Sequence, residues 1–274
     1  MSHEDEHFDN EAVVRPGRPA LMIQDGDFGA LPEEWAHLEA KRELFKSIIP
    51  SIGRLEIAET NRPVGTAFLA GRGILMTNRH VLESFADPVG DEWRIRPNVT
   101  VRVDFREEHG GTTPSELLVE GVIGVHGKYD LALLRVPATL DHIAKVLFLR
   151  GSEPEEPIKG REVVVIGYPD FDFTATPEQV TGVFQNVLGV KRLQPGKITG
   201  PRQHNNQPIF GHDCSTLGGN SGSCVLDVET GHVLGLHFGG TTTGGNMAVP
   251  MWKVARDPLL KDLQWVRKQR AART

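Results

Sequence analysis

The sequence feature that most constrains the fold is a long series of short β-strand patterns between residues 51 and 250. In the clearest of them, Val99, Val101, Val103 and Phe105 alternate with polar residues, as expected for a strand with one buried face. Glycine, proline and polar residues separate these patterns, and no helical crossover pattern lies between them. Many short strands without crossovers predict an all-β double barrel.

The series falls into two halves, each made of short strand patterns separated by turn residues. The polar stretch GSEPEEP at residues 151–157 joins them. We therefore expect a first barrel over about 50–150 and a second over about 160–252. Within the second half, strands are expected near residues 180–184 and 187–190, among others. The length of 274 residues suits one large domain or two small ones.

The segments outside this series have different patterns. Residues 1–30 are polar with several prolines and glycines, so we expect an extended or disordered arm. Residues 31–49 predict a helix with Pro32 at its first position and an apolar stripe that ends before Pro50. We expect it to pack on the outside of the first barrel, the alternative being a docking or inhibitory element. Residues 253–274 predict a C-terminal helix with Asp257 as its N-cap.

The composition argues against several classes of function. A net charge of −6 gives no global attraction to nucleic acid or to anionic membranes, and no apolar run is long enough to span a bilayer. The polar N-terminus lacks the basic start and apolar core of a secretory signal, which predicts a cytoplasmic protein. The histidine and cysteine spacings match no zinc site, and we expect neither metal nor cofactor. Cys214 and Cys224 are expected to be buried free thiols, with a disulfide between them as the alternative.

The chemistry concentrates in the stretch LGGNSGS at residues 217–223. Its glycines permit positive φ and leave the backbone around Ser221 free of neighbouring side chains. A hydroxyl is a poor nucleophile unless a base takes its proton, so the chain should also hold a histidine and a carboxylate in marked settings. His80 lies at the end of the apolar run GILMTNRHV, and Asp130 opens the run DLALLRV.

Three segments, TNRHV at residues 77–81, DLAL at residues 130–133 and GNSGS at residues 219–223, resemble in this order those of trypsin-like, chymotrypsin-fold serine peptidases. The resemblance covers roughly residues 50–252. It implies two six-stranded antiparallel β-barrels flanked by the N- and C-terminal helices, and an endopeptidase that forms an acyl-enzyme on a protein or peptide substrate. It also implies Ser221 as the nucleophile, His80 as the base and Asp130 as the group that orients the imidazole. The N–H groups of Gly219 and Ser221 would form the oxyanion hole.

Asn220 departs from the animal members of this family, which have an aspartate just before the nucleophile. There the aspartate pairs with a new N-terminus after zymogen cleavage, and an asparagine cannot form this ion pair. Activation by such a cleavage is therefore not expected, and another form of control is implied. The sequence GNSG at residues 219–222 is instead typical of bacterial members of the family.

Specificity for Lys or Arg in this family needs an aspartate six positions before the nucleophile, where this chain has Ser215. The runs STLGGNS at residues 215–221 and GLHFGG at residues 235–240 are instead similar to those of bacterial glutamyl endopeptidases. There a threonine and a histidine hold the substrate carboxylate, which implies the same roles for Thr216 and His237 and cleavage after Glu or Asp. The alternative is that His237 is a core residue. The expected strand edge for the substrate backbone comprises Phe238, Gly239 and Gly240.

Two other functions stay open at this point. A catalytically silent barrel that binds peptides or partners is the main alternative, although the presence of all three triad residue types argues against it. An esterase is disfavoured because the order and the elbow motif of α/β-hydrolases are absent. The lack of an activating cleavage suggests a regulatory partner that acts through the N-terminal arm or helix, in a bacterial stress or defence pathway.

Overall fold

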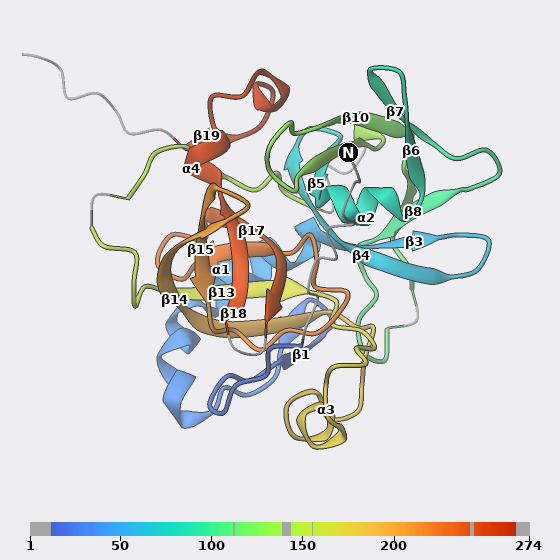
Figure 1. The fold of residues 1–274 in the computed structure, drawn as a ribbon. Coiled ribbons are helices and arrows are strands. Elements are labelled where there is room, and N and C mark those ends of the chain that lie inside the picture. Colours follow the sequence, from blue (N-terminus) through green and yellow to red (C-terminus); the bar gives the residue numbers. More distant parts are fainter. Residues whose placement is uncertain (1–11, 112, 139–143, 155, 242–243, 267–274) are drawn as a thin grey trace, which may run out of the picture.

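The computed structural model describes residues 12–111, 113–138, 144–154, 156–241 and 244–266. Its dominant features are two curved antiparallel sheets that lie side by side in Figure 1, with helices only at their margins. The all-β double-barrel prediction is confirmed in this arrangement. None of the helices among the described residues is long and apolar enough to cross a membrane.

The second half of the chain forms a closed barrel. Its strands follow the order β13-β16-β17-β18-β15-β14, and β14 pairs back with β13 from Glu162↔Lys197 to Gly167↔Arg192. Every backbone edge of these six strands is thereby paired over part of its length, and alternate side chains fill the interior. The strands are β13 (Glu162–Gly167), β14 (Arg192–His204), β15 (Gln207–His212), β16 (Cys224–Asp227), β17 (Val233–Thr241) and β18 (Gly245–Pro250).

The first half is a curled sheet of seven strands that stays open, unlike the closed six-stranded barrel that was expected. Its order is β10-β11-β5-β4-β3-β8-β9, and among the described residues β9 and β10 do not pair. The strands are β3 (Ile52–Ile57), β4 (Arg62–Gly71), β5 (Ile74–Thr77), β8 (Val101–Asp104), β9 (Glu116–Leu118), β10 (Gly121–Val125) and β11 (Ala132–Arg135). A separate hairpin comprises β6 (Ala86–Val89) and β7 (Glu92–Ile95).

An extended or disordered arm was expected over 1–30, and its described part, residues 12–30, is extended chain that joins the sheet of the second barrel. Strand β1 (Leu21–Gln24) pairs with β14 through Leu21↔Leu193, and β2 (Asp27–Phe28) folds back on β1. The cause is a small number of apolar side chains within a polar segment: Ile23 and Phe28 are buried in the main core. Residues 1–11 of the expected arm lie outside the described residues.

The helix expected over 31–49 is present as the 3-10 helix η1 (Glu33–Lys41), the helix α1 (Arg42–Ile48) and the short η2 (Ile49–Ser51). Its partner differs from the expected one, because it packs on the second barrel. Lys41 pairs with Glu229 at 2.9 Å, and a Cβ at Gly231 would lie 2.9 Å from side-chain atoms of α1. In Figure 1 this blue segment lies beneath the barrel of β13–β18.

Three further expectations were wrong, and one of them is the strand expected near residues 187–190, which is irregular. The C-terminal segment is not one helix: it forms α4 (Met251–Val254), η4 (Pro258–Leu260) and the strand β19 (Trp265–Val266), which pairs with β12 (Leu149–Arg150), while residues 267–274 lie outside the described residues. The strand expected near residues 180–184 is the helix α3 (Pro177–Phe184). Thr176 and Gln179 form a capping box at its start, which fixes the chain as a helix despite its β-branched residues.

Candidate active site

His80 and Asp130 meet because they follow and precede neighbouring strands of the first sheet. His80 lies in the short helix α2 (Arg79–Glu83) just after β5, Asp130 lies just before β11, and Thr77 pairs with Ala132 between them. One oxygen of Asp130 lies 2.6 Å from His80 Nδ1, and the other accepts the backbone N–H of His80 at 3.0 Å. The carboxylate therefore selects the tautomer with hydrogen on Nδ1, which leaves Nε2 as the basic nitrogen.

Ser221 lies in the loop before β16, and its carbonyl oxygen accepts the N–H of Thr66 from β4 at 2.8 Å. The next residue of the loop, Gly222, donates its N–H to the carbonyl of His237 at 3.0 Å. A Cβ at Gly65 would lie 2.8 Å from Val81 and 3.1 Å from the Ser221 carbonyl oxygen. Residue 65 must therefore be small, because Val81 of α2 and the serine loop both lie close to the position that its Cβ would take. The structure thus brings the serine loop beside the helix that carries His80.

The backbone before Ser221 is held by a contact of its Gly218 carbonyl. The carbonyl of Gly218 accepts the N–H of Asp170 at 2.6 Å, and in a trans peptide the N–H of Gly219 then points in the opposite direction. Gly219 has φ of +83°, and a Cβ there would lie 2.4 Å from the Tyr168 carbonyl oxygen. Among the described residues, neither the Gly219 nor the Ser221 N–H donates a hydrogen bond, so both are available to a developing oxyanion.

Thr66 braces this loop, and nothing in the sequence pattern singled it out. Its hydroxyl donates to the Gly219 carbonyl at 2.8 Å and accepts the N–H of Tyr168 at 3.2 Å. Its own carbonyl accepts the hydroxyl of Thr77 at 2.8 Å. With its N–H on Ser221, this fully buried residue is bonded through every polar group it has. Thr66 of the first sheet is therefore hydrogen-bonded to the loop that carries Gly219 and Ser221 in the second barrel.

Asn220 is held by an amide partner that the sequence analysis also missed. Gln194 on β14 donates to the Asn220 side-chain oxygen at 2.9 Å, and the Asn220 amide donates to the Leu217 carbonyl at 3.3 Å. Both side chains are fully buried. Neutral amides thus occupy the place where an aspartate would need a cationic partner, so the loop is fixed without a newly cut N-terminus.

A small pocket lies beside Ser221 and contains four of the five residues expected to bind substrate. Its volume is about 10 Å³, the room of roughly one water molecule, so a substrate side chain requires it to widen. Phe238 does not line it: its side chain is buried and its ring lies 5.4 Å from that of His204. The lining comprises Asp172, Thr216, Leu217, Gly218, Ser221, His237, Gly239 and Gly240.

The polar groups of this pocket are largely committed to other bonds. The Thr216 hydroxyl donates to the Asn246 oxygen at 2.6 Å, and the Asn246 amide donates in turn to the Cys214 carbonyl. The Thr216 hydrogen is therefore already used, so a bond from this hydroxyl to a substrate carboxylate would require it to rotate away from Asn246. His237 Nδ1 lies 3.2 Å from His212 Nε2, leaving His237 Nε2 for the pocket.

Burial decides the charge of both histidines. Desolvation lowers the pKa of His237 well below its usual value, with smaller contributions from the nearby His212 and His80. Desolvation, assisted by the charge of Arg202, lowers the pKa of His212 to about 3. Both rings are therefore neutral at neutral pH. Burial also raises the pKa of the Cys224 thiol to about 12, and both cysteines are buried and free, as expected.

Asp172 is a charged group of the pocket that the sequence analysis did not identify. One of its oxygens accepts the Gly218 N–H at 2.8 Å, and the other accepts the N–H and hydroxyl of Thr174. The carboxylate thus stabilises the loop before the nucleophile while placing a negative charge beside the substrate side chain. Among the described residues, no group of His, Cys, Asp and Glu side chains could hold a metal ion.

The expected strand edge is present at the end of β17. Its pairing with β16 ends at Leu236, while β18 covers the other edge. The edge of residues 238–240 that faces away from β18 has no strand partner in the described part of the chain. A substrate backbone can therefore add there as an extra strand.

Comparison with known proteins gives a consistent result. The family model described as trypsin-like peptidase domain matches residues 65–236. A probable serine protease of Lysobacter enzymogenes is 28% identical over 89% of this chain and 73% of its own length. A glutamyl endopeptidase of Staphylococcus aureus is 25% identical over 82% of this chain, which spans 61% of that relative's length. The crystal structure of Deg5, with a TM-score of 0.55 and 20% identity, covers 83% of this chain and 95% of its own and shares the fold.

Proposed function

The chain belongs to the family of trypsin-like serine peptidases, and we propose that it is an endopeptidase whose catalytic triad is His80, Asp130 and Ser221. The observation that carries this assignment is the double contact of Asp130 with His80, through the ring at 2.6 Å and the backbone N–H at 3.0 Å. Two bonds to one residue hold the ring in place and fix its tautomer together. A surface ion pair would do neither.

In the proposed reaction, Ser221 Oγ attacks the carbonyl carbon of the scissile bond while its proton passes to His80 Nε2. The carbonyl oxygen becomes an oxyanion that accepts the N–H groups of Gly219 and Ser221. The tetrahedral intermediate then expels the amine, which takes the proton from His80, and an acyl-enzyme remains. Water then attacks the acyl carbon and gives a proton to His80; the bond between this carbon and Ser221 Oγ breaks, the proton passes from His80 to Oγ, and the acid is released. Asp130 stabilises the imidazolium at each transfer, as in the established mechanism of this family.

The test is peptide hydrolysis by Ser221→Ala and His80→Ala, with Ser223→Ala as the matched control. Ser223 lies in the same loop, and its buried hydroxyl has no hydrogen-bond partner among the described residues. We expect activity to fall by about 10³-fold or more in the first two variants and to persist in the control. Wild-type activity in Ser221→Ala would refute the assignment.

We further propose cleavage after Glu or Asp. The support is the name of the Staphylococcus relatives and the place of His237 in the lining of a pocket beside the nucleophile. In this proposal His237 donates from Nε2 to the substrate carboxylate, and the Thr216 hydroxyl rotates away from Asn246 to add a second bond.

A second specificity is favoured by Asp172. Its carboxylate is the one charged group among the described residues that line the pocket, and it would attract a Lys or Arg side chain. A panel of peptides with Glu, Asp, Lys, Leu or Phe before the scissile bond decides between the two. Preference for Lys, abolished by Asp172→Asn, would replace the acidic specificity with the basic one.

A catalytically silent, peptide-binding barrel is favoured only by the small volume of the pocket. The hydrolysis test separates it from the peptidase. A partner that acts through the N-terminal arm also remains a proposal, supported by the pairing of Val13 with Thr216 at the pocket wall. The cytoplasmic location is likewise proposed, and cell fractionation tests it.

A further inference from the structure

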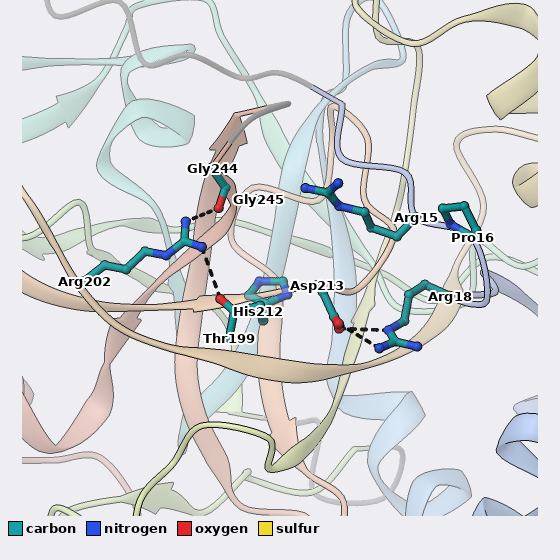
Figure 2. A pocket seen from close by; sticks show the side chains of 9 residues that line it. All are labelled: Arg15, Pro16, Arg18, Thr199, Arg202, His212, Asp213, Gly244 and Gly245. Carbon is teal, nitrogen blue, oxygen red and sulfur yellow. Dashed lines mark hydrogen bonds and ion pairs between the residues drawn. The ribbon is translucent and has the colours of Figure 1, made fainter.

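A second cavity of about 350 Å³ lies within the second barrel and its N-terminal cover, and the peptidase reaction does not use it. Its walls come from β14, β15, the start of β18 and the arm, as Figure 2 shows. In that view Arg202 and Arg15 lie on opposite sides of His212. The lining residues are Arg15, Pro16, Arg18, Thr199, Arg202, His212, Asp213, Gly244 and Gly245.

The cavity is cationic. Its lining holds three arginines and one acidic residue, Asp213, which is engaged by Arg18 at 2.9 and 2.7 Å. Arg202 donates to the Gly244 carbonyl and to the Thr199 hydroxyl, which uses two of the five N–H groups of a guanidinium. Its remaining donors have no acceptor among the described residues. Arg15 brings a second guanidinium to within 4.0 Å of the position of a Cβ on Gly245.

His212 provides an independent sign of a ligand. Its side chain is fully buried, and its Nδ1 has no hydrogen-bond partner in the described part of the chain. Its other nitrogen, Nε2, lies 3.2 Å from His237 Nδ1, and His212 is one of the residues that line the cavity. A buried polar atom without a partner destabilises the fold, and a ligand that accepts from or donates to it would remove that cost.

We propose that this cavity binds a small oxyanion of the phosphate class, and that its occupation weakens the binding of acidic substrates at His237. Two guanidinium groups and one imidazole approach from separate directions, which suits the tetrahedral oxygens of phosphate better than the two coplanar oxygens of a carboxylate. The volume admits a phosphate or a small phosphate monoester and excludes a large nucleotide.

The coupling to the substrate pocket, which rests on the proposed acidic specificity, follows from the hydrogen bond between His212 and His237. Two neutral imidazoles that share one hydrogen bond can present a donor at only one end of the pair. A substrate carboxylate requires the donor at His237 Nε2, which leaves a lone pair at His212 Nδ1. An anion in the cavity requires the donor at His212 Nδ1, which leaves a lone pair facing the substrate. The two anions therefore compete for one tautomer.

Binding is tested first, without substrate, by calorimetry on the full chain at about pH 8, where a phosphate monoester carries nearly two charges. The probes are inorganic phosphate and phenyl phosphate at constant ionic strength. We expect saturable binding at one site, weakened about tenfold or more in Arg202→Gln and in Arg15→Gln. Arg62→Gln is the matched control, because Arg62 is exposed on β4 in the first sheet, and it should bind as wild type. Equal affinity in all variants, or no saturable binding, would overturn the site.

The two probes distinguish the source of the phosphate. Binding of inorganic phosphate alone identifies the free ion, whereas comparable binding of phenyl phosphate identifies a phosphorylated small molecule, and either supports the site.

The coupling is tested by the kinetics of a glutamyl and a leucyl peptide. Saturating phosphate should raise KM for the glutamyl peptide by about threefold or more, with kcat unchanged, and leave the leucyl peptide unaffected. In His212→Phe the effect of phosphate should vanish. An unchanged KM at saturation would overturn the coupling. An enzyme that does not prefer Glu would refute the acidic specificity, while the calorimetric result would still decide whether the anion site exists.

Discussion

Replacing Thr66 by valine tests how the two sheets build one oxyanion site. Valine has nearly the shape of threonine, so the change removes only the hydroxyl. That hydroxyl donates to the Gly219 carbonyl at 2.8 Å and accepts the Tyr168 N–H at 3.2 Å, in a fully buried position. Its loss leaves the buried Tyr168 N–H without a partner and releases the carbonyl that orients the loop.

The magnitudes separate stability from catalysis. An orphaned buried N–H costs about 1–3 kcal/mol and a lost hydrogen bond about 1 kcal/mol, so the free energy of unfolding should fall by roughly 2–4 kcal/mol. If the loop then no longer presents the Gly219 N–H, the loss of one oxyanion donor lowers kcat by about 10²–10³-fold. KM should change little, because the substrate carbonyl gains this bond mainly in the transition state.

The assay is steady-state hydrolysis of one peptide combined with urea unfolding of the same preparations. Thr66→Ser is the matched control, since it keeps the hydroxyl and loses one methyl group, which costs about 1 kcal/mol of stability. It should keep a kcat near that of the wild type. A folded Thr66→Val enzyme with wild-type kcat, or equal damage in both variants, would refute the role of the hydroxyl.

Three other predictions follow from single contacts. Asp130→Asn should lower kcat by about 10⁴-fold, as the same change does in the type enzyme of this triad, because the amide favours the wrong tautomer of His80; a loss below tenfold in kcat would contradict this. Gln194→Ala should lower the unfolding free energy by about 1–3 kcal/mol, measured by urea unfolding, because the buried Asn220 oxygen loses its donor, and unchanged stability would show that the amide pair is dispensable. Burial lowers the pKa of His212 from about 6.5 in the unfolded chain to about 3 in the folded protein, so the unfolded state binds more protons between these pH values. The free energy of unfolding should therefore decrease as the pH is lowered through this range, by up to about 1.4 kcal/mol per pH unit. The decrease should be less steep in His212→Phe, and urea unfolding at several pH values would measure it.

The parts of the fold that could be predicted are those encoded in local patterns. Alternating residues such as Val101 and Val103 mark half-buried strands, and their burial in the first sheet follows the same alternation. The double-barrel arrangement was predicted from the many short strand patterns without crossovers, agrees with the resemblance to a known family, and was confirmed. The helix α3 was missed although its capping box, Thr176 to Gln179, is readable in the sequence, because the β-branched residues after it suggested a strand.

Errors of tertiary placement had a different origin. Because the N-terminal arm is polar on average, its sequence did not mark Ile23 and Phe28 as core residues. Their burial fixes the arm to the second barrel. The apolar stripe at residues 33–48 predicted that this helix packs against another part of the protein. Such a stripe does not indicate which sheet the helix contacts. The closure of a barrel likewise depends on both end strands together, and no single strand shows it.

At the site, sequence reasoning identified His80 and Asp130, and the structure brings them together. It could not identify Thr66 or Gln194, because their roles arise from contacts between residues more than twenty positions apart in the chain, such as Gln194 with Asn220 and Thr66 with Gly219. Nor could it show that the Thr216 hydroxyl is already bound to Asn246, a fact that depends on β18 lying behind the pocket. Motifs show which groups are present, whereas hydrogen bonding shows which of them are available.

The most direct test of the central claim is the mass of the intact protein after reaction with a fluorophosphonate, followed by peptide mapping of the adduct. Such reagents phosphonylate a serine hydroxyl, with loss of fluoride, only where a base and an oxyanion hole activate it. We predict one adduct, located on Ser221, absent from Ser221→Ala and formed far more slowly in His80→Ala, with Ser223→Ala labelled as wild type. A folded protein that forms no adduct, or forms it on another residue, would contradict the triad.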